Sequence, residues 1–278
     1  MKVFRTQKEL KSHLKNYSSK VKGFVPTMGA SHEGHLSLIR EAKLKSDVVI
    51  WSIFVNPTQF NNPKDFEKYP STNDKDIDLL TNEGCDILYL PIDAKDVYLN
   101  ERPISVTLGG IAEVMEGANR PGHFDGVMQV VKVLFDIVEP NKAFFGLKDF
   151  QQYSIIKKME SELNLGIEIV GCAIVREESG LAMSSRNMLL GDEEKQDALV
   201  ISEVLYFLQE EIKIGNITDL LKVCKKKINA KSKLEYLIVA NSETLETVEI
   251  LENNKEYRAF VVSHVGNVRL IDNMEIFI

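Results

Sequence analysis

The sequence predicts an α/β fold, in which a Rossmann-like parallel sheet with flanking helices is followed by a smaller α+β domain. Strand-like and helix-like runs alternate through the first two thirds of the 278 residues, as in parallel strands joined by crossover helices. From about Glu177, two helical stretches precede three strand-like runs. The chain is longer than a typical domain of ~100 to 200 residues. We therefore expect two domains, 1–175 and 176–278.

Short apolar runs between turn residues predict five strands in the first domain, at 23–26, 48–55, 87–90, 143–145 and 167–175. Apolar residues at helical spacing predict helices at 37–44, 73–82, 126–137 and 150–163. A further short helix at 7–15 follows Thr6, a residue suited to its N-cap. Pro140 ends the helix predicted at 126–137, as a proline just beyond a C-terminus commonly does.

The second domain is predicted to contain helices at 193–212 and 220–228, followed by strands at 236–239, 259–264 and 268–271. A run of three lysines, 225–227, lies in the second of these helices. So short a charge run indicates a solvated helix face more than a nucleic-acid surface.

Composition argues against nucleic-acid-binding, membrane-spanning and secreted proteins. The net charge of -7 argues against a nucleic-acid partner, and 44% hydrophobic residues suffice for a core. No apolar run approaches the ~18 residues of a membrane span, and the first residues lack the apolar region of a signal peptide. The three cysteines, Cys85, Cys172 and Cys224, show no disulfide or metal spacing. We expect a cytoplasmic protein that binds no membrane.

The segment 26–38 holds two glycines and two histidines between a predicted strand and a predicted helix. A helix N-terminus favours an anion, because its backbone N–H groups are unpaired and its macrodipole is positive there. Gly29 and Gly34 allow a ligand close to the backbone. His32 and His35 have imidazoles that donate hydrogen bonds to phosphate oxygens. The segment therefore predicts a phosphate site.

Other interpretations of this segment are weaker. The glycine spacing imitates a P-loop, but His35 and Leu36 stand where that motif needs Lys and Ser or Thr, and no G-x-G-x-x-G is present. For an isolated H-x-x-H, a zinc pair or two surface histidines is at least as common an explanation as a phosphate site. Zinc needs third and fourth ligands, and the isolated cysteines do not supply them.

Two further segments follow predicted strands of the sheet. Asn56 and Gln59 come after the second strand, and the carboxyl ends of parallel strands face the ligand crevice in such folds. Their amides suit a hydroxyl or carboxylate, although Asn-Pro is also an ordinary turn. The glycine-rich turn 119–126 has Asp125 as an expected helix cap. We expect a structural role for it, with Arg120 and His123 as minor site candidates.

Lys148 follows Gly146 at a predicted helix start and indicates a second anion site. A lysine gains nothing from the dipole at that end of a helix, so a bound phosphate would explain it. Asp149 suits ribose hydroxyls or is simply a helix-start acid. In 175–187, small polar residues precede Arg186, and this segment suits either nucleotide phosphates or a plain interdomain linker.

Four ordered segments together resemble the pantoate–β-alanine ligase family. They are P-T-M-G-A-S-H-E-G-H at 26–35, F-V-N-P-T-Q-F at 54–60, F-G-L-K-D-F-Q-Q at 145–152 and M-S-S-R-N at 183–187. The first is similar to the H-I-G-H element of class I synthetases and the last to their K-M-S-K-S loop. The resemblance implies a Rossmann-like nucleotidyltransferase domain in 1–175 that binds nucleotide and pantoate, a lid in 176–278, and a homodimer.

The resemblance also implies the reaction. ATP would activate (R)-pantoate as pantoyl adenylate with release of pyrophosphate, and β-alanine would then displace AMP to give pantothenate. Mg²⁺ is the implied metal, with unknown ligands. Three alternatives are an adenylyltransferase acting on a phosphorylated acceptor, a class I aminoacyl-tRNA synthetase and an ATP-sensing module. The neutral amides Gln59 and Gln152 favour a small hydroxy acid over a phosphorylated acceptor.

The family's site residues carry over by motif. The implied catalytic residues are His35, His32, Lys148 and Arg186. The implied ATP contacts are Met28, Gly29, Ala30, Ser31, His32, Glu33, Gly34, His35, Gly146, Leu147, Lys148, Asp149, Val175, Met183, Ser184, Ser185 and Arg186. The implied pantoate and β-alanine contacts are Gln59, Gln152, Asn56 and Met28. Ser71 stands where the family usually has arginine, and Leu147 replaces a common glutamate.

Overall fold

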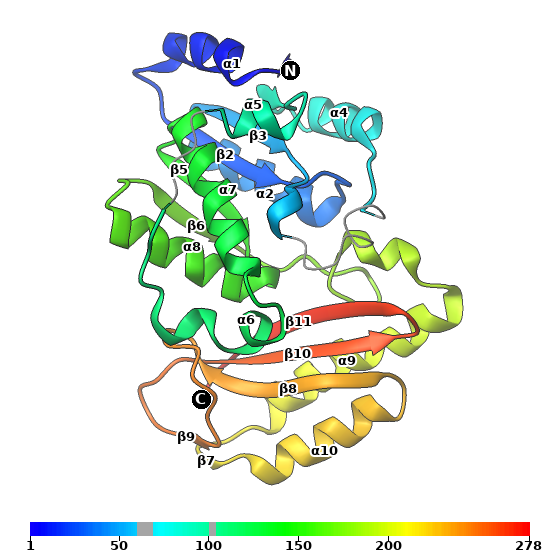
Figure 1. The fold of residues 1–278 in the computed structure, drawn as a ribbon. Coiled ribbons are helices and arrows are strands. Elements are labelled where there is room, and N and C mark those ends of the chain that lie inside the picture. The colour runs from blue at the N-terminus through cyan, green and yellow to red at the C-terminus, as the bar shows by residue number, and fades with distance from the viewer. Residues whose placement is uncertain (60–68, 100–103) are drawn as a thin grey trace. The chain divides into compact units, whose positions relative to one another are not determined.

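A computed structural model describes residues 1–59, 69–99 and 104–278. Their contacts divide the chain into two compact units. The first contains Met1–Leu147 and Gln151–Ala173, and the second contains Lys148–Phe150 and Ile174–Ile278 (Figure 1).

The first unit is built on a six-stranded sheet with strand order β1-β4-β3-β2-β5-β6. Every pairing in it is parallel. The strands are β1 (Lys2–Phe4), β2 (Lys22–Thr27), β3 (Val48–Ile53), β4 (Ile87–Tyr89), β5 (Lys142–Gly146) and β6 (Glu168–Cys172). The α/β prediction is therefore confirmed, although the edge strand β1 was not predicted.

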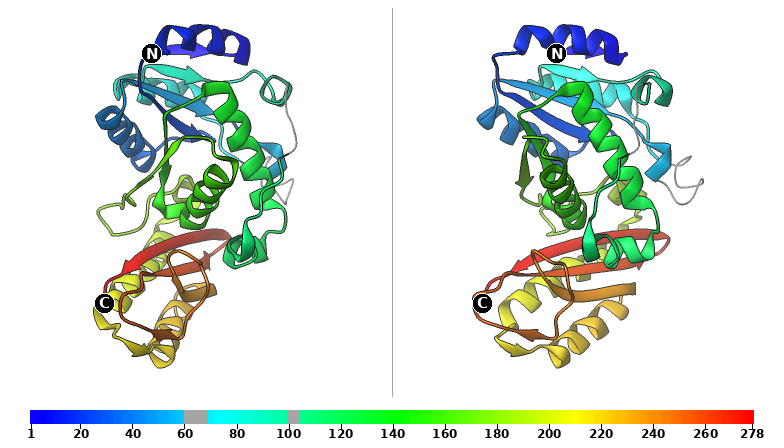
Figure 2. Two further views of the ribbon diagram at one scale, coloured as in Figure 1. Left: turned by 90° about the vertical axis from the view of Figure 1, so that its left-hand side faces the viewer. Right: turned by 60° about the vertical axis from the view of Figure 1, so that its left-hand side comes forward.

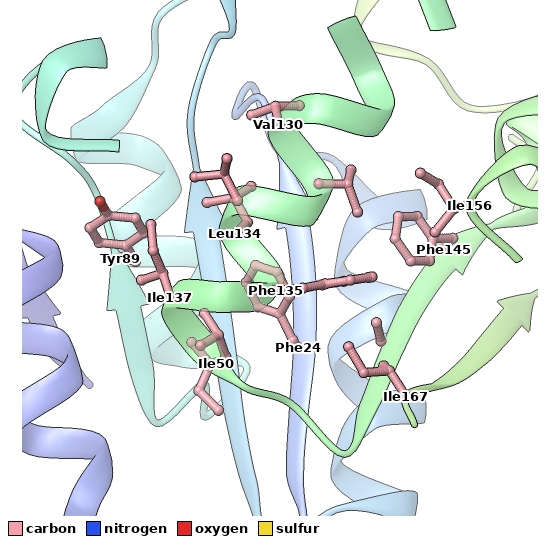
Figure 3. Close-up of a cluster of buried hydrophobic side chains, with 14 of the residues drawn as sticks. Phe24, Ile50, Tyr89, Val130, Leu134, Phe135, Ile137, Phe145, Ile156 and Ile167 are labelled. Atoms are coloured by element: carbon pink, nitrogen blue, oxygen red, sulfur yellow. The ribbon is translucent and has the colours of Figure 1, made fainter. Parts of the chain in front are cut away.

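Helices cover both faces of this sheet. The helices of this unit are α1 (Gln7–Leu14), α2 (Glu33–Lys45), α4 (Asn73–Asn82), α5 (Ala94–Val97), α6 (Met115–Asn119), α7 (His123–Val138) and α8 (Phe150–Leu163), with 3₁₀ turns at Lys15–Tyr17, Pro57–Gln59, Gly109–Ala112 and Leu147–Asp149. Side chains of α1, α7 and α8 form one core with alternate residues of the strands. In Figure 3, Phe135 of α7 lies against Phe24 of β2, with ring centroids 6.3 Å apart. The opposite face packs Val25 and Trp51 against α2 and α4.

Two predictions about helix starts have different outcomes. Thr6 caps α1 as predicted, because its side chain accepts a hydrogen bond from the backbone N–H of Glu9. Asp125 is not the cap of α7. That helix begins at His123, and its N-cap is Gly122 with φ +78°, a conformation that glycine adopts without penalty.

The order in which the chain adds strands to the sheet reverses at β2, so that β3 and β5 lie on opposite sides of it. From β2 the chain continues to the neighbouring β3 and then to β4, and it later returns to β5 on the other side of β2. In open α/β sheets, ligands bind at the carboxyl ends of the strands beside such a switch point. This edge of the first unit is therefore the expected ligand edge.

The second unit contains an antiparallel sheet of β8 (Lys233–Asn241), β10 (Tyr257–Val265) and β11 (Val268–Ile276). The helices α9 (Asp192–Glu211) and α10 (Thr218–Asn229) share its core, and Figure 2 shows these yellow helices beside the orange and red strands. A 3₁₀ turn at Ser185–Leu189 and the short pair β7 (Gly215–Asn216) and β9 (Ile250–Leu251) complete it. The predicted α+β arrangement is confirmed. No helix among the described residues has the length and apolar character needed to cross a bilayer.

Candidate active site

The loop between β2 and α2, residues 28–32, has an unusual backbone. Gly29 and Ala30 both have positive φ, +83° and +53°. An L-residue such as alanine rarely adopts this conformation, so the loop needs contacts that stabilise it. The chain then enters α2 with His32 as its N-cap in extended conformation. The histidine segment therefore lies at a helix N-terminus, as its sequence predicts.

Asp76 of α4 supplies the stabilising contacts. Its carboxylate accepts hydrogen bonds from the backbone N–H groups of Ala30 (3.0 Å) and Ser31 (2.7 Å). It also accepts one from the hydroxyl of Thr72 (3.1 Å), and its side chain is fully buried. Asp76 was not predicted as a site residue, because in the sequence it resembles any acid in the first turn of a helix.

The two histidines lie together at the start of α2. Their rings are stacked with centroids 4.0 Å apart. The rings of His35 and Trp51 are in an edge-to-face arrangement, with centroids 6.4 Å apart. Both side chains are half-buried. Trp51 belongs to β3, so the sheet itself supports the position of His35. Two imidazoles are thus held side by side at a helix N-terminus.

The turn after β3 brings Gln59 against the histidine loop, since the Nε2 of Gln59 donates to the Sδ of Met28. The carbonyl of Gln59 accepts a hydrogen bond from Nδ1 of His123 at 2.8 Å. At Gly126 a Cβ would lie 2.8 Å from the carbonyl oxygen of Thr58, so only glycine allows α7 to approach this turn so closely. Two residues predicted for the site from separate loops, Met28 and Gln59, are therefore in contact. Phe60, the last residue of this motif, lies outside the described residues.

Asn56 supports this turn. It is fully buried, its Nδ2 donates to the carbonyl of Gly126 (3.1 Å), and its Oδ1 accepts from the hydroxyls of Tyr98 (2.8 Å) and Thr58 (3.1 Å). These contacts engage both polar atoms of the amide within the protein. They give Asn56 a clear means of positioning Gln59, three residues further on.

Three loops with predicted ligands leave the same edge of the sheet. They follow β2, β3 and β5, which are adjacent and parallel in the order β3-β2-β5. The last of them begins with Gly146 and Leu147. Gln152 is also in the first unit, in the first turn of α8, and is partly exposed.

Lys148 is tied to the second unit. Its carbonyl accepts a hydrogen bond from Nδ2 of Asn273 in β11 at 2.8 Å. Phe150 packs against the ring of Phe260 (5.9 Å) and under the guanidinium of Arg258 (4.2 Å). These contacts explain why Lys148–Phe150 groups with residues far along the chain. The Lys148 side chain is half-buried, and Asp149 is exposed.

The segment 175–187 is held by hydrogen bonds within itself and by hydrogen bonds that it donates to β11. Arg176 pairs with Ala182 in an antiparallel bridge, and the N–H of Met183 donates to the carbonyl of Val175. Nδ2 of Asn187 donates to Glu177 (2.8 Å) and to the carbonyl of Ala182 (3.1 Å). These hydrogen bonds connect the two halves of the segment to each other.

Asp272 fixes this loop to the sheet of the second unit. Its carboxylate accepts two hydrogen bonds from the guanidinium of Arg176, at 2.6 and 3.1 Å. Its backbone neighbour Asn273 holds Lys148, so two consecutive residues of β11 hold two segments of the candidate site. Burial raises the pKa of Asp272, and the Arg176 charge opposes that rise. Neither Asp272 nor Asn273 was predicted from the sequence as part of the site.

The described parts of the chain contain no group of three or more His, Cys, Asp or Glu side chains that could hold a metal ion. The three cysteines are free and buried. Burial raises the pKa of the Cys172 thiol to about 11, so the reactive thiolate is scarce at neutral pH.

Comparison with known proteins identifies the family. The family model described as pantoate-beta-alanine ligase matches residues 2–275. The chain belongs to this family. It is 46% identical to the pantothenate synthetase of Christiangramia forsetii, over 99% of both chains. It is 44% identical to that of Cytophaga hutchinsonii, over 97% of both chains.

Solved structures of family members agree with this assignment. The crystal structure of pantothenate synthetase from Thermus thermophilus matches with a TM-score of 0.91 at 34% identity, over 100% of both chains. The pantoate-beta-alanine ligase from Francisella tularensis, solved in complex with beta-gamma ATP and beta-alanine, matches with a TM-score of 0.83. It is 37% identical, and the match covers 99% of this chain and 97% of that one. The resemblance drawn from four sequence segments is confirmed.

Proposed function

We propose that this chain is an ATP-dependent ligase that joins (R)-pantoate and β-alanine to form pantothenate. The family match over residues 2–275 carries this proposal. It is supported by the Francisella tularensis relative, which was solved in complex with beta-gamma ATP and beta-alanine. The contact between Met28 and Gln59 at the carboxyl edge of β2 and β3 adds support from this chain's own geometry.

In the first step, a carboxylate oxygen of pantoate attacks the α-phosphorus of ATP. The bond from that phosphorus to the bridging oxygen breaks, and pyrophosphate leaves with the electron pair. The substrate is the nucleophile, so the protein supplies position and charge stabilisation. His35 and His32 donate hydrogen bonds to phosphate oxygens, while Lys148 and Arg186 offset the growing negative charge.

In the second step, the amine of β-alanine attacks the acyl carbon of pantoyl adenylate. AMP leaves and the nitrogen loses a proton, which yields the amide. An acyl adenylate hydrolyses if water reaches it, which gives closure of the site a chemical purpose. In the proposal, residues 1–175 bind nucleotide and pantoate, and residues 176–278 act as the lid.

The other site residues have positioning roles in this proposal. Gln59 and Gln152 hold the hydroxyl and carboxylate groups of pantoate, and Asn56 acts by fixing the turn that carries Gln59. Met28 lies between the pantoate and ATP sites. The remaining ATP contacts are the backbone and side chains of Gly29, Ala30, Ser31, Glu33, Gly34, Gly146, Leu147, Asp149, Val175, Met183, Ser184 and Ser185.

Magnesium enters the proposal as part of the MgATP substrate. Mg²⁺ keeps several waters and often binds through one or two carboxylates and substrate phosphates. In this proposal the cation is held mainly by the phosphates of ATP. A homodimer and a cytoplasmic location belong to the same proposal.

Pyrophosphate release tests the function and the residue roles together. The wild type is expected to release pyrophosphate from ATP only when pantoate is present, and to form pantothenate when β-alanine is added. His35→Ala and Lys148→Ala should each lower the adenylation rate by ~10²-fold or more, the scale of losing one preorganised donor. Lys157→Ala, an exposed lysine of α8, is the matched control and should keep the wild-type rate.

Three results would contradict this proposal. Pantoate-independent pyrophosphate release would contradict the assigned substrate. AMP transfer to a phosphorylated acceptor would identify an adenylyltransferase. Near-normal adenylation by His35→Ala and Lys148→Ala would contradict the residue roles.

A further inference from the structure

We propose that Asp76 is a positioning residue that presets the histidine loop for catalysis by binding its backbone N–H groups. This inference rests on the proposed function, because it concerns how the adenylating histidines are placed. Asp76 has no assigned role in the reaction described above, and it lies on α4, outside every motif that identified the site.

The partners of Asp76 argue for this role. Among the described residues they are N–H and O–H donors, namely the amides of Ala30 and Ser31 and the hydroxyl of Thr72. A fully buried carboxylate is costly unless such donors compensate it. Charge-assisted hydrogen bonds to backbone N–H groups are also stronger than neutral ones. The loop and the carboxylate therefore stabilise each other.

The loop conformation depends on these bonds. The positive φ of Gly29 and Ala30 orients consecutive N–H groups toward Asp76, and a non-glycine residue keeps such a conformation only when its surroundings impose it. His32, which follows Ser31, is the N-cap of α2, and His35 in the first turn of that helix stacks on its ring. The orientation of the Ala30 and Ser31 peptides thus fixes where α2 begins and where both imidazoles lie.

The same hydrogen bonds determine which groups of the loop can bind a phosphate. The sequence suggests that free backbone N–H groups of this loop bind the anion, but two of them are already bound to an internal carboxylate. A phosphate cannot use those donors, and the Asp76 charge disfavours an anion beside it. Phosphates are then left to the imidazoles, the cationic side chains and the remaining N–H groups. The loop is preorganised before ATP binds.

Asp76→Asn tests this inference, because an amide of the same shape presents an N–H donor to one of the two loop N–H groups. We expect kcat for pantoate-dependent pyrophosphate release to fall about 10- to 100-fold, the scale of a small misplacement of catalytic groups. KM for ATP should change less than about threefold, since the interaction lost acts on the transition state. Amide hydrogen exchange at Ala30 and Ser31 should become faster, a readout that needs no activity.

Two further variants make the experiment decisive. Asp78→Asn changes an exposed acid of the same helix and should leave kcat and exchange within about twofold of wild type. Thr72→Val removes one of the three donors and should lower kcat by about fivefold, the value of one hydrogen bond. If Asp76→Asn does not fold, the Thr72→Val variant still tests the inference.

Several results would overturn the inference. They are an unchanged kcat in Asp76→Asn, a loss that equals the fall in folded protein measured by circular dichroism, and a loss that excess Mg²⁺ restores. The last would mark Asp76 as a metal ligand. If the wild type shows no pantoate-dependent pyrophosphate release, the proposed function fails, and the exchange rates of Ala30 and Ser31 still test the contact.

Discussion

Two loops that carry proposed nucleotide ligands are held in different ways. The histidine loop, residues 28–32, is held through its backbone, by a buried carboxylate that accepts from two peptide N–H groups. The loop at 175–187 is held by backbone hydrogen bonds within itself, by the Asn187 amide and, at β11, by the buried Arg176–Asp272 ion pair. The first arrangement needs positive φ angles beside a buried carboxylate, whereas the second adds a buried ion pair with a distant strand.

This difference teaches where each loop is vulnerable. A backbone-held loop tolerates changes of its own side chains but not a change of backbone conformation. A loop held by a buried ion pair is damaged when one partner is removed, because the other charge stays buried without compensation. Substitutions of three kinds test this contrast.

The largest effect is expected from Asp272→Ala, which breaks the side-chain arrangement. It leaves the Arg176 guanidinium, whose side chain is only 15% exposed, without its carboxylate. The free energy of unfolding should fall by about 3 kcal/mol, as measured by urea denaturation followed by circular dichroism. The double variant Arg176→Met, Asp272→Leu removes both charges and should recover most of that loss. A decrease below about 1 kcal/mol in Asp272→Ala would show that the pair does not hold the loop.

A smaller effect is expected from Gly29→Ala, which breaks the backbone arrangement. The new Cβ would lie 2.9 Å from Cγ2 of Ile53, and φ at this position is +83°. The conformational cost alone is about 1–2 kcal/mol, so unfolding should become easier by about 2 kcal/mol, and kcat should fall. Gly110→Ala is the control, because its Cβ meets nothing within 4 Å and should change stability by less than about 0.5 kcal/mol. Equal losses in the two variants would contradict the assigned strain.

The smallest effect is expected at the more exposed ion pair of the second unit, Glu235 with Arg269. Hydrogen bonds from Arg269 lower the pKa of Glu235, against the effect of partial burial. A carboxyl with a lowered pKa stabilises the fold above its ordinary pKa, and that stabilisation is lost as the pH falls through the lowered value. Glu235→Gln should therefore cost up to about 1 kcal/mol at pH 7 and nothing once the wild-type carboxyl is protonated. Urea denaturation across that pH range measures this difference, and a gap that widens at low pH would refute it.

The sequence was most informative where local pattern decides the structure. The helices at 73–82 and 150–163 are confirmed to the residue, because turn residues and apolar spacing delimit them. β1 was missed because a strand of three residues is too short to show an alternation of apolar and polar residues. Its pairing with β4 makes it a strand. The start of α7 was misplaced because the left-handed Gly122 outweighs the capping preference of Asp125.

The candidate site shows the same limit. The histidines, Gln59 and Lys148 were named from motifs, since their residue types carry the chemistry. Asp76 and Asp272 were not, because burial and distant partners make them important. Asp76 is separated from its amide partners by more than 40 residues, and no local period records such a contact.

The path of the chain between the units has a practical consequence. Because Lys148–Phe150 belongs with the second unit while both flanking segments belong to the first, the polypeptide passes from one unit to the other three times. A fragment truncated after Val175 would keep Lys148 but lose Asn273, the donor to its carbonyl. Domain dissection by truncation or by limited proteolysis would therefore not yield an intact first half. Recombinant studies of nucleotide affinity require the entire chain.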